Sequence, residues 1–117
     1  KADYKAKRVS NTLQGIELEV DNKNIWFRLI GDFNAYNLMA VYGAADLLGE
    51  ESEAILTALS SMNPAEGRFE VVDSSSDITA IVDYAHTPDA LKNVLETIAQ
   101  FRTGNYCRWL RGKSWYQ

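Results

Sequence analysis

The sequence predicts a mixed α/β fold, because two hydrophobic periods alternate along it. Stretches in which every second residue is apolar are typical of strands, and stretches in which apolar residues recur every three or four positions are typical of helices. Turn-forming residues separate these stretches, as at Asn63-Pro64 and in the run from Asp73 to Asp77. We expect an antiparallel hairpin and two helices, followed by two more strands and a third helix.

The expected hairpin occupies the first part of the chain. Residues 12–20 form its first strand, because apolar and acidic residues alternate from Ile16 onward. The polar residues 21–24 form the turn, and the apolar residues 25–30 return as the second strand. This order predicts that the two strands pair antiparallel.

Two helices follow the hairpin. The first begins near Phe33, with Asp32 as its expected N-cap and Gly49 as its stop. The second closes before Asn63-Pro64, since the residue before a proline is disfavoured in a helix. The apolar residues expected on the inward face of the first helix are Leu38, Val41, Tyr42, Ala45 and Leu48. In the second helix they are Ile55, Leu56 and Leu59.

The last part of the chain predicts two strands and a helix. Residues 69–73 and 78–84 are the strands, and Thr87-Pro88 supplies the N-cap and first-turn residues with which helices prefer to begin. A strand that leads directly into a helix is the first half of a parallel α/β unit. The buried stripe expected on this third helix is Leu91, Val94, Leu95, Ile98 and Phe101.

Three polar residues follow the last strand, where ligands collect in parallel α/β units. They are Asp83, Tyr84 and His86. Each also has a purely structural interpretation: Asp83 only caps the next helix, Tyr84 packs on its neighbour and His86 is a solvated loop residue. The residues alone favour the structural interpretation for most of them.

Composition excludes several classes of protein. The chain has 117 residues, of which 46% are hydrophobic and 24% charged, as in soluble globular domains rather than disordered chains. A net charge of -4 argues against nucleic-acid binding, and a single cysteine excludes a disulfide-stapled mini-protein. No apolar run approaches the length of about 20 residues that a membrane span needs. We expect a cytoplasmic protein, and the start at Lys1 rather than Met suggests a piece of a longer one.

The sequence offers few residues that could bind a metal ion or act as a catalytic nucleophile. One histidine and one cysteine, far apart in the sequence, lack the spacing of metal ligands. Cys107 has no neighbouring base that would make it a nucleophile. Glycine-rich phosphate loops of the common types are not found in the sequence.

Three stretches carry a family resemblance. They are GDFNAYNLMAVYGAA (Gly31 to Ala45), NPAEGRFEVV (Asn63 to Val72) and VDYAHTPDALKNVL (Val82 to Leu95). In order and spacing they resemble the Mur ligases, over most of residues 1–104. Within that family they look most like the enzymes that add the third amino acid, commonly meso-diaminopimelate or lysine, to UDP-N-acetylmuramoyl-L-alanyl-D-glutamate in peptidoglycan synthesis. The alanine-adding ligase and folylpolyglutamate synthase carry looser variants and are alternatives.

The resemblance implies a division of the chain. Mur ligases have a UDP-binding domain, a central ATPase domain and a C-terminal Rossmann-like domain. Residues 1–67 would be the end of the central domain, and residues 68–104 the first strand–strand–helix part of the C-terminal one. Such a fragment is expected to be inactive alone and to self-associate. An alternative function is a non-catalytic nucleotide-binding or interaction module.

The resemblance also implies a reaction and its residues. ATP phosphorylates the substrate carboxylate, and the incoming amine attacks the acyl phosphate; Mg²⁺ takes part, with its ligands expected outside this fragment. Arg68 matches the arginine near the ATP γ-phosphate, where a planar fork of donors suits the transferring group. The nucleotide residues would be Asn37 at the adenine, with Asn34 on the same helical face, Asp83 at the ribose and His86 beside it. Tyr84 is expected to be structural.

Residues 105–117 form an atypical tail. The last sixteen residues hold four basic side chains and no acidic one, whereas residues 1–101 hold 8 basic and 16 acidic ones. In the Mur ligases a short apolar strand and a glycine-rich turn follow at this point. For one choice of codons, reading Asn105 to Trp115 one base later gives I-I-V-V-G-C-G-G-N-R-G, which has that pattern. We therefore expect a shifted reading frame, with a basic interaction tail as the alternative.

Overall fold

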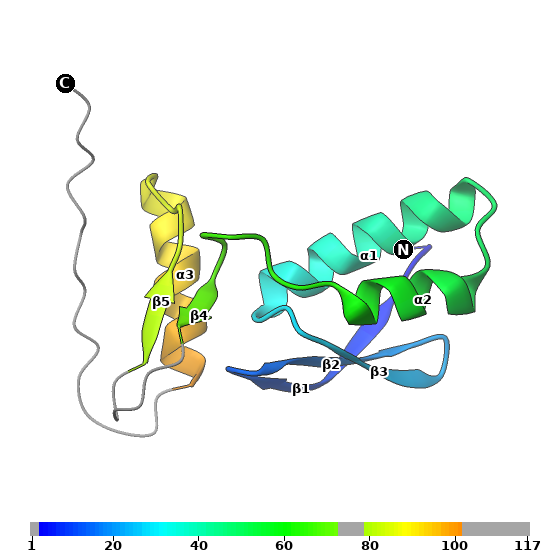
Figure 1. Cartoon of the computed structure of the whole chain (residues 1–117), viewed down its shortest axis with the longest axis horizontal. Coiled ribbons are helices and arrows are strands. Elements are labelled where there is room, and N and C mark those ends of the chain that lie inside the picture. Colours follow the sequence, from blue (N-terminus) through cyan, green and yellow to red (C-terminus); the bar gives the residue numbers. More distant parts are fainter. Residues whose placement is uncertain (1–2, 73–78, 102–117) are drawn as a thin grey trace.

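The computed structural model describes residues 3–72 and 79–101 and confirms the mixed α/β class (Figure 1). The expected tail at 105–117 and the turn from Asp73 to Asp77 lie outside the described residues. A three-stranded sheet has the order β1-β2-β3, and a two-stranded sheet pairs β4 with β5. The elements in chain order are β1 (Ala6–Thr12), β2 (Gly15–Val20), β3 (Lys23–Phe27), α1 (Asp32–Leu47), α2 (Ser52–Ser61), β4 (Glu70–Val72), β5 (Ala80–Val82) and α3 (Pro88–Gln100).

The three-stranded sheet contains the predicted hairpin and one strand more. β2 and β3 pair antiparallel, with Leu18 opposite Ile25. Their turn is tighter than expected, because Asp21 and Asn22 both take a positive φ, as the central residues of the commonest hairpin turns do. The predicted first strand, 12–20, was wrong at its start. The chain turns at residues 13–14, and residues up to Thr12 form β1.

Helices α1 and α2 pack beside the three-stranded sheet (Figure 1). The alternation predicted for β2 is confirmed, since Ile16, Leu18 and Val20 are buried while the glutamates between them are partly exposed. The three apolar residues predicted to face inward from α2 are also buried. The main core consists of Ile16, Leu18, Val20, Phe27, Leu38, Tyr42, Ile55, Leu56 and Leu59.

The ends of α1 differ in how well the sequence predicts them. Gly49 stops the helix as expected: its φ is 92°, and its amide donates to Asp46 O while that of Glu50 donates to Ala45 O. The N-cap is Gly31, with φ of 91°, and not Asp32. Asp32 is instead the first helical residue, where its carboxylate accepts two hydrogen bonds from Arg8 Nη1 on β1, at 2.7 and 2.8 Å.

Two residues of the predicted α1 stripe are exposed. Val41 is 52% exposed and Leu48 is 85% exposed. Leu38 and Tyr42 supply the buried contact of this helix, and Leu48 lies past its last turn as the C-cap. The inward face of α1 is therefore narrower than the apolar pattern predicts.

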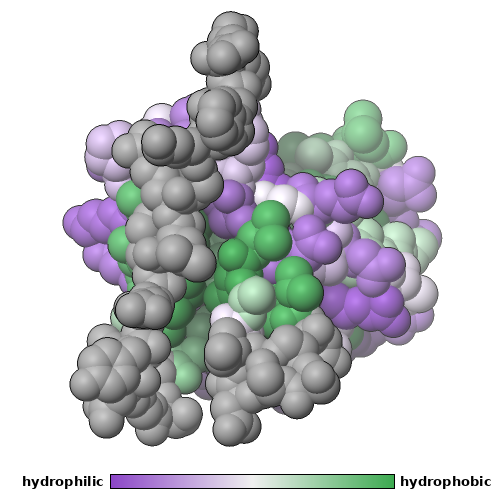
Figure 2. Space-filling view, turned by 60° about the vertical axis from the view of Figure 1, so that its left-hand side comes forward, coloured by the Kyte–Doolittle hydropathy of each residue, from purple (hydrophilic) through white to green (hydrophobic). Residues whose placement is uncertain are grey.

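The C-terminal unit consists of β4, β5 and α3. The strands pair antiparallel, with Val71 opposite Ile81. Thr87 caps α3 as predicted, because its Oγ1 accepts a hydrogen bond from the amide of Ala90 at 3.3 Å. Figure 2 shows hydrophobic side chains at the surface on the side of the molecule that carries this unit.

The buried face of α3 differs from the predicted stripe at two positions. Val94 is buried as expected, but Leu95 is 36% exposed and Thr97 is 5% exposed. Thr97 fits against Gly31, where a Cβ would meet its Cγ2 at 2.9 Å, and its Oγ1 donates to Asn93 O at 2.8 Å. A small polar residue therefore takes the place at which α3 approaches the start of α1.

A second hydrophobic cluster joins the two parts of the chain. Ile30, Phe69 and Val94 form its buried centre. The ring centroids of Phe33 and Phe69 lie 6.1 Å apart, and Asn11 Nδ2 donates to Gln100 Oε1 at 3.1 Å. The start of α1 thus lies beside the segment that leads into β4. None of the helices in the described ranges is long and apolar enough to cross a membrane.

Candidate functional site

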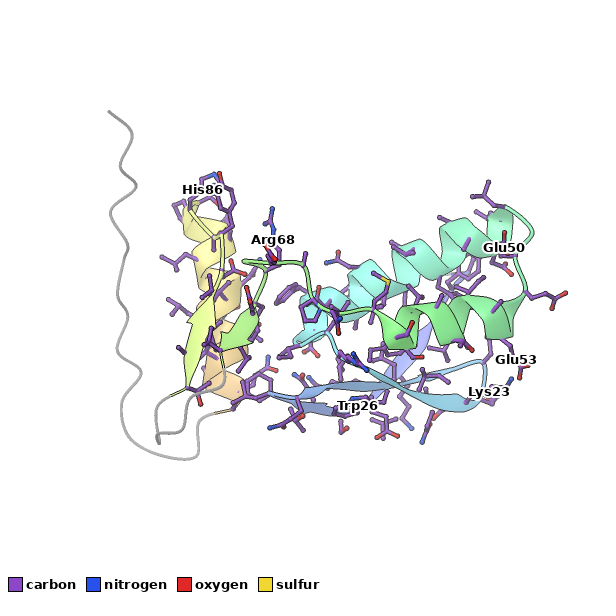
Figure 3. All side chains as sticks on the ribbon, in the orientation of Figure 1. Lys23, Trp26, Glu50, Glu53, Arg68 and His86 are labelled. Atoms are coloured by element: carbon purple, nitrogen blue, oxygen red, sulfur yellow. The ribbon has the colours of Figure 1, made fainter. Side chains whose placement is uncertain are left out.

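Arg68 lies at the apex of a tight turn between α2 and β4 (Figure 3). Its backbone amide donates to Ala65 O at 3.0 Å. The residues on either side, Gly67 and Phe69, have positive φ angles of 66° and 47°. Phe69 is buried in the second cluster, whereas Arg68 is exposed. The turn therefore presents the guanidinium to solvent from an anchored backbone.

The end of β5 holds this turn in place. Asp83 Oδ2 accepts a hydrogen bond from the amide of Phe69 at 2.7 Å, and its Oδ1 accepts one from Ala85 N at 2.7 Å. The amide of Tyr84 donates to Gly67 O at 2.8 Å. Asp83 does not cap α3, because Thr87 does so. Its carboxylate connects the strand end to the arginine turn.

The side chain of Glu70, two residues after Arg68, also hydrogen-bonds to the turn. One carboxylate oxygen of this residue accepts a hydrogen bond from the amide of Gly67 at 3.0 Å. The amides of Gly67, Arg68 and Phe69 are thus all hydrogen-bonded. Because unpaired amides are costly when water is excluded, this arrangement stabilises a backbone conformation that a non-glycine residue such as Phe69 rarely adopts.

The ring of Tyr84 contacts the side chains of both Arg68 and His86. The Arg68 Cζ atom is 5.4 Å from the centroid of the Tyr84 ring, within the range of a cation–π contact. The His86 ring meets the Tyr84 ring edge to face, with centroids 4.9 Å apart. His86 Nδ1 also lies 3.0 Å from Tyr84 O. Figure 3 shows Arg68 and His86 at the same end of the C-terminal unit.

Asn34 and Asn37 form a separate pair at the start of α1. Asn34 Nδ2 donates to Ile30 O at 2.8 Å, and Asn37 Nδ2 donates to Asn34 Oδ1 at 3.2 Å. Asn34 is half-buried and Asn37 is exposed. The pair reaches the arginine turn only indirectly, through the contact of Phe33 with Phe69.

The structure therefore brings Arg68, Asp83 and His86 together and leaves the asparagine pair apart. Sequence reasoning missed the contact of Tyr84 with Arg68 and the part of Glu70 in the turn. The role of Glu70 could have been predicted, since a carboxylate three residues after a glycine can reach back to the amide of that glycine. Nothing in the local sequence places Tyr84 under Arg68, because that contact depends on how β5 meets the turn.

The neighbouring cavity is not formed by the candidate residues. A volume of about 350 Å³ opens at the junction of the two parts of the chain. Its lining includes Arg28, Asn63 and Phe69, but none of the five candidate residues. Across residues 3–72 and 79–101, no three His, Cys, Asp or Glu side chains gather as they would around a metal ion. The candidate residues thus form a polar surface near this cavity and do not line it.

Comparisons with known proteins agree with one another. The family described as Mur ligase, glutamate ligase domain, matches residues 67–111. The chain is 60% identical over 104 residues to UDP-N-acetylmuramoyl-L-alanyl-D-glutamate–2,6-diaminopimelate ligase of Cytophaga hutchinsonii, covering 89% of this chain and 21% of that protein. The same-named protein of Phocaeicola vulgatus is 48% identical over 103 residues, covering 88% and 21%.

A solved structure is similar as well. It is UDP-N-acetylmuramate–alanine ligase MurC from Thermotoga maritima, with a TM-score of 0.71 and 30% sequence identity. The match covers 84% of this chain and 24% of that one. The chain therefore spans about a fifth of the length of the curated relatives that it matches.

Proposed function

The chain belongs to the Mur ligase family, and from this premise we propose that it is part of an ATP-dependent ligase of peptidoglycan precursor synthesis. The enzyme would add the third amino acid to UDP-N-acetylmuramoyl-L-alanyl-D-glutamate. Both curated relatives above are named for adding 2,6-diaminopimelate, which makes that amino acid the proposed substrate. We place the reaction in the cytoplasm, with the rest of the enzyme supplying the ligands of Mg²⁺.

We propose that residues 1–67 end the central domain and that residues 68–104 begin the C-terminal domain. Two features support this division. The main core takes its buried residues from the first part of the chain, and the two sheets share no strand. The second cluster then acts as the contact between the domains, with Ile30 on one side and Val94 on the other.

Arg68 is the proposed catalytic residue. In the reaction, a carboxylate oxygen of the substrate attacks the γ-phosphorus of ATP and ADP leaves, which gives an acyl phosphate. The amine of the incoming amino acid then attacks the acyl carbon, and phosphate leaves as the amide forms. Negative charge is redistributed over the phosphoryl oxygens in the first step, so a fixed guanidinium would lower its barrier.

The remaining residues would hold the nucleotide. Asn37 is exposed, and its amide group can donate to and accept from a purine edge, while Asn34 orients it through the 3.2 Å hydrogen bond. Each carboxylate oxygen of Asp83 already accepts one backbone amide and retains a lone pair for a ribose hydroxyl. His86 would close the same side of the site.

One observation carries this proposal: Arg68 projects from a turn whose three amides are all hydrogen-bonded. Electrostatic catalysis needs a charge that is already in place when the reaction begins. An exposed arginine on an ordinary loop would not meet that need.

The test is to express the complete reading frame that contains this sequence and to measure ADP release. We expect release that requires both UDP-N-acetylmuramoyl-L-alanyl-D-glutamate and diaminopimelate, and an upstream phosphate-binding loop in the same frame. Lysine in place of diaminopimelate serves as the specificity control. No ADP release with either amino acid, from a folded protein, would instead favour the non-catalytic module.

A further inference from the structure

We propose that Tyr84 is a positioning residue, which holds the guanidinium of Arg68 and the imidazole of His86 in fixed orientations through its aromatic ring. The sequence alone favours a structural part for this tyrosine. The proposal rests on the proposed function, in which Arg68 acts on the transferring phosphoryl group.

The contact between Tyr84 and Arg68 restrains a long side chain that has no ion pair with another described residue. The arginine Cζ lies 5.4 Å from the ring centroid. Within residues 3–72 and 79–101, the ion pairs are Arg8 with Asp32, Lys23 with Glu53 and Lys92 with Glu96, so none involves Arg68. A cation over the face of an aromatic ring is attracted by the ring's negative quadrupole. Among the described residues, the ring face of Tyr84 is therefore the group that limits where the guanidinium of Arg68 can lie.

Tyr84 is itself held at its backbone. Its amide donates to Gly67 O at 2.8 Å, which ties it to the turn that carries Arg68. The preceding residue, Asp83, is bonded to Phe69 of the same turn. The ring and the arginine thus sit on two segments that are joined on both sides of the contact. A ring placed in this way can order the guanidinium before the nucleotide binds.

His86 depends on the same residue. Its ring packs edge to face on Tyr84 at 4.9 Å, and its Nδ1 is 3.0 Å from Tyr84 O. When Nδ1 carries the proton it donates to that carbonyl, which leaves Nε2 as an acceptor directed away from the backbone. One tyrosine thus sets the placement of two of the proposed site residues.

The ring, and not the hydroxyl, is the part that matters. Within the described residues the Tyr84 hydroxyl has no hydrogen bond. The ring makes the contact with Arg68 and the edge-to-face contact with His86, whereas the contact of His86 Nδ1 is with the backbone oxygen of Tyr84. Tyr84→Phe should therefore preserve the effect and Tyr84→Leu should remove it. Tyr84 is 63% exposed, so neither change opens a cavity in a core.

The first arm of the test uses NMR on the chain itself, at a concentration at which sedimentation velocity shows a monomer. Ring-current shifts are recorded for the Arg68 δ-protons, assigned by their loss in Arg68→Lys, and for His86, which is the single histidine of the sequence. We expect both shifts to persist in Tyr84→Phe and to disappear in Tyr84→Leu. Tyr36→Leu is the matched control, because Tyr36 is 80% exposed and lies on α1. Unchanged shifts in Tyr84→Leu would overturn the proposal.

The second arm uses the complete enzyme. Tyr84→Leu should lower kcat about tenfold with little change in the KM for ATP, because misplacing a catalytic group costs rate more than affinity. Tyr84→Phe should keep the wild-type kcat. Equal losses in both variants, or no loss in Tyr84→Leu, would contradict the positioning role.

The two arms separate this inference from the proposed function. If the NMR shifts behave as expected and the wild-type enzyme releases no ADP, the ligase assignment fails and the positioning role in catalysis fails with it. If the wild-type enzyme is active and the shifts do not respond, only the inference about Tyr84 fails. Should Tyr84→Leu lose its fold, the Tyr84→Phe variant still decides, since a loss of either shift or of kcat in it would overturn the proposal.

Discussion

Asp83, at the end of β5, accepts a 2.7 Å hydrogen bond from the backbone amide of Phe69, the residue that follows Arg68. The proposed ribose ligand is thereby also a structural part of the turn that carries the proposed catalytic arginine. If Asp83 binds the ribose as proposed, one carboxylate would couple binding of the nucleotide sugar to placement of the arginine. A change at Asp83 should therefore affect more than nucleotide affinity.

Asp83→Asn should destabilise the turn. An amide group can accept through its oxygen only, so its NH₂ group would face one of the two backbone amides that the carboxylate now satisfies. We expect a loss of about 1–3 kcal/mol in unfolding free energy, measured by urea denaturation. In the complete enzyme, kcat should fall as well as the affinity for ATP.

Glu96→Gln is the control for Asp83→Asn, since it removes one negative charge from an exposed position of α3. Its partner, Lys92, lies at 3.7 Å and both side chains are largely exposed, so this pair should contribute little. Equal stability of Asp83→Asn and wild type would show that the two backbone bonds do not hold the turn.

Asn37→Ala should mainly raise the KM for ATP in the complete enzyme. Its amide group is proposed to contact the adenine, and such a contact would be equal in the ground state and the transition state, so kcat should change little. Asn34→Ala should raise the KM less, because Asn34 acts by orienting Asn37 through the 3.2 Å hydrogen bond. A larger effect of Asn34→Ala than of Asn37→Ala would reverse this assignment.

The chain by itself should associate as its concentration rises. Val72 and Val82 of the two-stranded sheet are 43% and 48% exposed, and Leu47 and Leu48 at the end of α1 are also largely exposed. Within the described residues, β4 and β5 pair only with each other, which leaves strand edges open to pairing. Sedimentation velocity over a range of concentrations should show growing species. A monomer with a sharp, concentration-independent thermal transition would contradict this expectation.

Tyr42→Phe should change how stability depends on pH. The hydrogen bond from the Tyr42 hydroxyl to Asp21 raises the pKa of this tyrosine in the folded state. Its contribution is therefore fully present below the pKa of the unfolded chain, about 10, and is lost as pH rises through the higher folded value. At pH 7 the variant should be less stable by about 1 kcal/mol.

The gap between Tyr42→Phe and wild type should narrow in the alkaline range. Urea unfolding at pH 7 and at about pH 11 measures it. Tyr4, whose pKa is also raised by a carboxylate partner, titrates in both proteins and so does not affect the comparison. A gap that widens with pH would show that the hydroxyl does not stabilise the fold as a donor.

The sequence predicted best where a few adjacent residues determine the structure. Thr87 and Pro88 begin α3, and Gly49 ends α1, because caps and stops act within one helical turn. The sequence did not predict β1, whose exposed residues show no clear period and which forms only by pairing with β2. The exposure of Leu48 and the burial of Thr97 likewise depend on which elements meet.

The candidate site divides in the same way. Arg68, Asp83 and His86 could be named from the motifs that carry the family resemblance. In the structure Tyr84 contacts both Arg68 and His86, and Asp83 is bonded to the turn that carries Arg68. The contact between Tyr84 and Arg68 could not be predicted from the sequence, because it depends on how β5 packs beside the turn. Long-range contacts of this kind leave no periodic trace in the sequence.

The proposed reaction depends above all on stabilisation of the transferring phosphoryl group by Arg68. Single-turnover ADP formation by the complete enzyme measures this role, with Arg68→Ala compared with Arg28→Ala. Arg28 is an exposed arginine whose side chain hydrogen-bonds to Asn63. We expect Arg68→Ala to slow the chemical step about 10²- to 10³-fold, with a much smaller change in ATP affinity, and Arg28→Ala to retain the wild-type rate. An unchanged rate in Arg68→Ala, or a loss confined to ATP affinity, would contradict the account.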